Sequence, residues 1–270
     1  MAQSLAGVRG FMKAARRSVL VTGASSGIGA ELAEELARRG YAVWLAARRL
    51  DRLESVVARI VEQGGIAHAV VIDVANAVAC AAAVRKVDDD AAGLDVVVAN
   101  AGVAGDDISA WSGDSDEAAA VVATNLTGAL STLMPLLPRM KERRRGHLVG
   151  ISSLAAEVTL PLGAVYGASK AALSFWLDSV APELARHGVA VTVVHLGFVR
   201  SEMTAKNRFP MPWLQETTTS VVRIADAIEE RRAWLRFPWP LALLTRVSAW
   251  LPRRWRAALV RNNSGPKVDR

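Results

Sequence analysis

Short apolar runs alternate with helical patterns along most of this 270-residue chain. Seven runs rich in β-branched residues lie at Val19–Thr22, Ala42–Ala46, His68–Ile72, Leu94–Ala99, His147–Ser152, Val189–His195 and Ala233–Phe237. Helical patterns separate them, among them Ala30–Arg39, Asp51–Glu62, Glu117–Glu142 and Leu173–His187. The runs are apolar without alternation, as expected for strands that helices cover on both faces. The pattern therefore predicts an α/β fold with a doubly wound, seven-stranded parallel sheet.

No repeat or interdomain linker interrupts this pattern, so we expect one domain over residues 18–237, after a leader (1–17) and before a tail (238–270). In the leader, Arg16 and Arg17 precede an apolar run that is too short for a signal-peptide core. Pro135 and Pro138 should bend or break the longest helix. The single Cys80 cannot form an internal disulfide, and no apolar stretch reaches the roughly 18–20 residues of a spanning helix. We therefore expect a cytoplasmic protein.

The positive charge of the chain is concentrated in the tail. The net charge is +7, but residues 231–270 carry ten basic residues and one acidic residue, which leaves residues 1–230 at −2. A near-neutral body with a basic tail fits a local anionic partner better than nucleic-acid binding. We therefore expect no nucleic-acid partner.

The first strand runs into a glycine-rich turn that opens a helix. Its candidate nucleotide contacts are Gly23, Ser25, Ser26, Gly27, Ile28 and Gly29. Glycines let the backbone approach a pyrophosphate closely, and the helix N-terminus offers free N–H groups. The alternative is a turn with no ligand, but its place between a first strand and a helix favours nucleotide binding.

The ends of the next strands supply further candidates. Arg48 and Arg49 follow the second strand, where an arginine accommodates the 2′-phosphate of NADP and an acid would favour NAD. The alternative is a solvated arginine pair. Asp73 and Val74 follow the third strand and are candidates for the adenine edge. The small residues of Asn100-Ala101-Gly102 would leave room for a nucleotide at the sheet's carboxyl edge.

Tyr166 and Lys170 are four residues apart on a predicted helix, so their side chains are neighbours. An ammonium beside the phenol should lower the tyrosine pKa from its usual value of about 10. A surface pair on an amphipathic helix is the alternative. Ser153 ends the fifth strand thirteen residues before Tyr166, so both hydroxyls can converge at one edge of the sheet. Asn125, on the preceding helix, is a candidate polar relay.

Together these motifs resemble the short-chain dehydrogenase/reductase family in order and spacing, over roughly Arg17 to Phe237. The resemblance implies a Rossmann-type fold, a homodimer or homotetramer, and NADP(H)-dependent hydride transfer to or from a hydrophobic ketone, aldehyde or secondary alcohol. It implies that Tyr166 is the general acid or base, that Lys170 binds the nicotinamide ribose, and that Ser153 stabilises the substrate oxygen. Asn125 would hold a water linked to Lys170. Gly197, Val199 and Ser201 would hold the carboxamide.

Two positions depart from the family pattern. Leu196-Gly197 stands where Pro-Gly is usual, which should loosen this turn and weaken the carboxamide contact. Glu157 stands where glycine is common. Its carboxylate would face either the substrate or solvent, and we favour solvent.

Two segments should determine what reaches the site. Residues 201–220 are expected to form a substrate lid, whose large apolar residues are Met203, Phe209, Met211, Trp213 and Leu214. Pro210 and Pro212 prevent a regular helix there, and the side chains indicate a hydrophobic substrate. The tail pairs an apolar helix that ends at Pro252 with arginines and Trp255. Residues 238–261 are either a peripheral membrane contact or a helix packed on the cleft or on a second subunit.

A rival hypothesis is a scaffold or sensor that binds NADP(H) without turnover. The complete set of Asn125, Ser153, Tyr166 and Lys170 argues against it, because a binding module has no use for a proton donor.

Overall fold

The computed structural model describes residues 17–105, 113–159, 163–207, 210–252 and 254–255. Within them, seven parallel strands form one sheet in the order β3-β2-β1-β4-β5-β6-β7. The strands are β1 (Ser18–Thr22), β2 (Ala42–Ala47), β3 (Ile66–Val71), β4 (Val96–Ala99), β5 (Gly146–Ser153), β6 (Val189–Leu196) and β7 (Trp234–Phe237). The predicted sheet is confirmed. The predicted leader, apart from Arg17, lies outside the described residues, as do Phe209 and residues 256–270.

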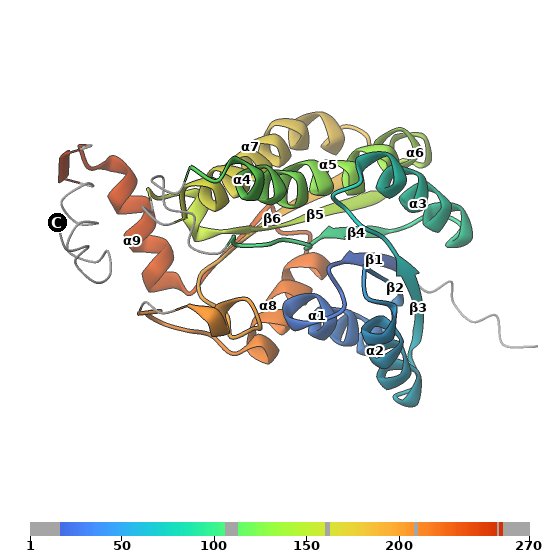
Figure 1. The fold of residues 1–270 in the computed structure, drawn as a ribbon. Helices are drawn as coiled ribbons and strands as arrows, with labels where there is room; N and C mark the ends of the chain where they lie inside the picture. The colour runs from blue at the N-terminus through green and yellow to red at the C-terminus, as the bar shows by residue number, and fades with distance from the viewer. Residues whose placement is uncertain (1–16, 106–112, 160–162, 208–209, 253, 256–270) are drawn as a thin grey trace, which may run out of the picture.

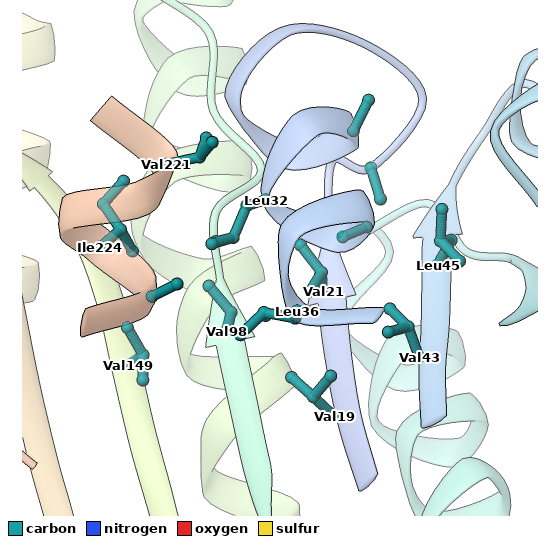
Figure 2. Close-up of a cluster of buried hydrophobic side chains, with 14 of the residues drawn as sticks. Val19, Val21, Leu32, Leu36, Val43, Leu45, Val98, Val149, Val221 and Ile224 are labelled. Atoms are coloured by element: carbon teal, nitrogen blue, oxygen red, sulfur yellow. The ribbon is translucent and has the colours of Figure 1, made fainter. Parts of the chain in front are cut away.

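Helices cover both faces of this sheet (Figure 1). One face carries α1 (Gly27–Arg38), α2 (Leu50–Glu62) and α8 (Thr217–Glu229); the other carries α3 (Ala77–Asp90), α4 (Ser115–Val122), α5 (Gly128–Leu133), α6 (Leu137–Arg143) and α7 (Ala164–Ala185). Every side chain of β1 and β4 is buried, as expected for central strands of a doubly wound sheet. Figure 2 shows the hydrophobic core between the sheet and the face that carries α1 and α8, where Leu32 and Leu36 of α1 and Ile224 of α8 lie over the sheet.

The helix expected at Glu117–Glu142 is divided into shorter pieces. A 3-10 turn at Met134–Leu136 separates α5 from α6 and contains Pro135, which confirms the predicted break. A π-helical turn at Ala123–Thr127 separates α4 from α5 and was not predicted. By length and composition, Ser115–Arg143 is the one stretch of the described chain that is apolar enough to cross a membrane, contrary to the expectation from the sequence. Its segment α5 contacts β4 and α3, as a core helix does.

The last four residues of the segment expected as a lid, 201–220, belong to a helix. Helix α8 begins at Thr217, and its buried face packs against α1. Thr217 and Ser220 lie on that buried face, and the connection from β6 ends at Glu216. After β7, helix α9 (Trp239–Trp250) packs against β7 and the 3-10 turn Leu154–Ala156.

Candidate active site

A cleft lies at the carboxyl edge of the sheet, where the first six strands end. It is lined by nearly all of the predicted site residues: Gly23, Ser25, Ser26, Gly27, Ile28, Gly29, Arg48, Arg49, Asp73, Val74, Asn100, Ala101, Gly102, Ser153, Tyr166, Lys170, Gly197, Val199 and Ser201. Asn125 is the predicted site residue that does not line it. The structure thus brings together motifs that lie far apart in the sequence.

The glycine-rich turn has the geometry of an anion cradle. Gly23 has a φ of +68°, which favours glycine. A Cβ atom on Gly29 would lie 2.5 Å from the Asn100 Nδ2 atom and would also clash with the Gly23 carbonyl oxygen. Helix α1 starts at Gly27, and Ser26 makes no side-chain capping bond. The backbone N–H groups of its first turn are therefore not capped by a serine hydroxyl and can serve an anion.

Thr22 is a residue that the sequence analysis missed. Its Oγ1 atom accepts hydrogen bonds from the backbone N–H groups of Asn100 (3.1 Å) and Ala101 (3.2 Å). The Asn100 side chain donates to the Thr22 carbonyl oxygen at 2.8 Å. These bonds join the turn after β1 to the turn after β4. The available signal in the sequence was a threonine at the end of an otherwise apolar strand, directly before Gly23.

The two arginines after β2 differ in their contacts. Arg49 Nη2 donates to the hydroxyl oxygens of Ser25 (3.0 Å) and Ser26 (3.3 Å). Arg48 is exposed at the cleft wall and makes no ion pair within the described residues. Arg48 therefore offers a guanidinium to an anionic group, while Arg49 braces the glycine-rich turn.

Tyr166 and Lys170 lie in the first turns of α7, both lining the cleft. The Lys170 Nζ atom donates to the Ile151 carbonyl oxygen at 2.8 Å and lies 5.9 Å from the centroid of the Tyr166 ring. Burial lowers the pKa of Lys170 to about 8. Burial also raises the pKa of Tyr166, and a hydrogen bond with Ser153 partly opposes this rise. The expected lowering of the Tyr166 pKa by Lys170 was therefore wrong for the protein alone, because burial of the phenol dominates its pKa and Ser153, not Lys170, is the group that opposes the rise.

Ser153 is held at the end of β5. Its Oγ atom donates to the Leu196 carbonyl oxygen at 3.2 Å and accepts from the Ala155 N–H at 3.1 Å. Leu196 is its register partner in β6. The hydroxyl is thus fixed beside Tyr166 by the pairing of two strands.

Asn125 lies behind the cleft, in the π-helical turn, and is fully buried. Its side chain donates to the Val103 carbonyl oxygen (2.9 Å) and to Ser169 Oγ (3.1 Å), and accepts from the Val103 N–H (2.8 Å). A Cβ atom on Gly102 would lie 3.2 Å from Asn125 Oδ1 and 3.3 Å from Lys170 Nζ. Asn125 therefore ties the loop after β4 to α7, close to Lys170.

Glu157 faces neither substrate nor bulk solvent, so both alternatives considered for it were wrong. Its Oε1 atom accepts from Arg236 Nε of β7 at 2.8 Å, and its Oε2 atom accepts from Thr245 Oγ1 of α9 at 3.1 Å. His195 Nδ1 lies 3.6 Å from Oε1. The carboxylate joins the loop after Ser153 to three elements that come later in the chain.

The turn at Gly197 makes contacts that need no proline at position 196. Its N–H donates to the Phe237 carbonyl oxygen at 2.8 Å. A Cβ atom on Gly197 would lie 2.8 Å from Pro238 Cδ and 3.0 Å from Leu241 Cδ2. The start of α9 therefore packs on this turn and holds it.

Thr204, also missed from sequence, orders the start of the connection from β6 to α8. Its hydroxyl donates to the Val199 carbonyl oxygen at 2.7 Å and accepts from the Ser201 N–H at 2.9 Å. Met203, directly before Thr204, lines the cleft. Trp213, further along the same connection, is exposed.

Comparisons with known proteins agree with this architecture. A family model described as short chain dehydrogenase matches residues 17–211. An uncharacterized oxidoreductase of Myxococcus xanthus is 46% identical over 236 residues, which cover 87% of this chain and 93% of that protein. A 3-oxoacyl-(acyl-carrier-protein) reductase of Staphylococcus aureus is 36% identical over 189 residues, which cover 70% of this chain and 76% of that protein. A crystal structure of an actinorhodin polyketide ketoreductase with NADPH matches with a TM-score of 0.76 at 28% identity. The match covers 84% of this chain and 97% of that chain. The chain therefore belongs to the short-chain dehydrogenase family of oxidoreductases.

Proposed function

We propose that this protein is an NADP(H)-dependent reductase, and in reverse a dehydrogenase, of a hydrophobic ketone or aldehyde and the corresponding secondary alcohol. The observation that carries the proposal is the meeting of Ser153, Tyr166 and Lys170 in the cleft that also holds the glycine-rich turn. The similarity to a ketoreductase crystallised with NADPH and to an oxoacyl reductase supports the same reaction class.

The cleft residues fit a phosphorylated dinucleotide. The part of the cleft that Gly23, Gly27 and Gly29 line, at the N-terminus of α1, suits a pyrophosphate. Arg48, which has no ion-pair partner among the described residues, suits a 2′-phosphate. Asp73 and Val74 would contact the adenine, and Gly197, Val199 and Ser201 the carboxamide. When bound, the nicotinamide supplies or accepts the hydride.

The remaining step is a proton transfer at the substrate oxygen. Tyr166 would donate its Oη proton to this oxygen during reduction and take it back during oxidation. The raised pKa keeps the phenol protonated in the protein alone, so it is ready to donate. Ser153 Oγ would hydrogen-bond the same oxygen as charge develops on it. Lys170 would bind the nicotinamide ribose, and Asn125 would support Lys170 through the loop after β4.

The surroundings of the cleft bear on the substrate and the assembly. Met203, Met211 and Trp213 precede α8 in the connection from β6, and their apolar side chains suit a hydrophobic substrate. We propose further that the protein works in the cytoplasm as a homodimer or homotetramer, with its tail, residues 238–261, at a membrane surface.

NADPH oxidation followed by absorbance, with ketones and aldehydes of increasing chain length, tests the proposal. Turnover should rise with hydrophobic length, and Tyr166→Phe should reduce kcat by at least about 100-fold while NADPH still binds. Full activity in Tyr166→Phe would refute the proton-donor role. NADPH binding without turnover of any carbonyl would favour the scaffold or sensor hypothesis instead.

A further inference from the structure

The outward side of helix α9 is unusually apolar for an exposed surface. Trp239, Leu243, Val247 and Trp250 recur at the spacing of one helix face, and all are exposed. Trp239 is 74% exposed and Trp250 is 90% exposed. Exposed apolar side chains grouped in this way mark an interaction surface more often than scattered single residues do. We call these four residues the α9 outer face.

The orientation of α9 is fixed by contacts on its inner side. Thr245 is buried and donates to the Glu157 carboxylate at 3.1 Å. Ala242 is buried, and Leu241 packs against the turn at Gly197. Because both polar and apolar contacts hold this side against the body, the outer face is presented to the surroundings in a defined orientation.

Positive charge accompanies the outer face. Arg246 and Arg254 are exposed, and neither forms an ion pair within the part of the chain that the structure describes. Arg246 lines a shallow surface hollow with Val247 and Trp250. Helix α9 itself contains no acidic residue. A guanidinium beside indole and aliphatic side chains suits the boundary between lipid headgroups and acyl chains.

We propose that the α9 outer face docks on an anionic lipid bilayer, with its tryptophans at the acyl boundary and Arg246 and Arg254 on the headgroup phosphates. The 12 residues of α9 span about 18 Å at 1.5 Å per residue, too short for the roughly 30 Å hydrocarbon core. The helix therefore lies on the bilayer and does not cross it. Charge favours lipid over a second copy of the chain, because two α9 faces would bring unneutralised guanidinium groups together.

Docking would also orient the cleft. Leu241 contacts the turn at Gly197, and Gly197 lines the cleft. The segment from β6 to α8 begins at this turn, and it carries the exposed side chains of Met203 and Trp213. The mouth of the cleft would thus lie close to the lipid. A substrate dissolved in the bilayer could then enter the cleft directly. This delivery rests on the proposed reductase function, whereas docking itself does not.

Co-sedimentation of the full-length chain with vesicles tests the docking. At low salt, binding to phosphatidylcholine vesicles that contain phosphatidylglycerol should be at least tenfold stronger than to pure phosphatidylcholine, and high salt should weaken it. Val247→Asp should reduce binding at least tenfold. Val78→Asp, at an exposed valine of α3, is the matched control and should leave binding unchanged.

Three results would overturn the proposal. One is failure of the full-length protein to sediment with the anionic vesicles at low salt. Another is an equal loss of binding in both valine variants. The third is that the wild type forms an oligomer, Val247→Asp dissociates it, and neither the wild type nor this variant binds vesicles. That result would assign the outer face to a second copy of the chain. NADPH oxidation with a short, water-soluble ketone should be unchanged in Val247→Asp, so loss of docking is distinguishable from failure of the reductase assignment.

Discussion

Replacing Glu157 by glutamine should destabilise the fold by about 2–3 kcal/mol, because the charge of Arg236 would lose its counter-ion. The side chains of Glu157 and Arg236 are 16% and 26% exposed, and Arg236 Nε lies 2.8 Å from the carboxylate. Breaking a buried pair by removing one partner costs about 3–5 kcal/mol, and an exposed pair contributes about 0–1 kcal/mol. The partial exposure of this pair places the expected loss between those limits, nearer the buried one.

Glu216→Gln is the matched control for this prediction. Arg200 Nε lies 3.0 Å from Glu216 Oε1, a nearly identical geometry, but these side chains are 65% and 59% exposed. The control should therefore lose no more than about 1 kcal/mol. Equilibrium urea unfolding of the wild type and both variants at one pH gives the two differences directly. If the two substitutions differ by less than about 1 kcal/mol, burial does not strengthen the Glu157 pair and the argument fails.

Three further predictions concern the cofactor side and the core. Arg48→Ala should weaken NADPH binding about 10- to 100-fold and NADH binding less than about threefold in a fluorescence titration; equal losses would exclude a 2′-phosphate contact. Gly29→Ala should lower the free energy of unfolding by about 1–3 kcal/mol, although alanine is the better helix former, because the new methyl group would lie 2.5 Å from Asn100 Nδ2; a gain in urea resistance would contradict this. Burial and the charge of Arg231 lower the pKa of His147 from 6.5 to about 4. The unfolded chain therefore takes up this proton first, and stability present above pH 6.5 should fall by roughly 3 kcal/mol as the pH drops to 4. His147→Gln should flatten that fall, and an unchanged slope would show that other groups cause it.

The parts of the site that local sequence determines were predictable. The glycine-rich turn, Arg48 and the Tyr166–Lys170 pair each lie at the end of a strand or the start of a helix. A parallel sheet brings such ends to one edge, so their meeting follows from the alternating pattern alone. The π-helical turn at Asn125 was not predictable in this way, because it depends on packing between the loop after β4 and α7.

The properties that long-range packing determines were missed or given the wrong sign. Spacing along a helix indicated a lowered Tyr166 pKa, but the shift depends on how much solvent the folded chain removes, and burial raises it. Glu157 was expected to face the substrate or, as favoured, solvent. Its actual partners, Arg236 and Thr245, come about 80 to 90 residues later in the chain. No local pattern joins a carboxylate to a guanidinium and a hydroxyl at such separations.

Glu157 connects the loop after Ser153 to helix α9. A glycine at this position would make none of the contacts with Arg236 and Thr245. Without them, α9 would rest on the body through Ala242, the contact of Leu241 at Gly197 and its packing against β7. The carboxylate gives the helix a charged anchor four residues after Ser153. Glu157 and α9 are therefore parts of one structural feature. That feature sets the position of the apolar surface beside the mouth of the cleft.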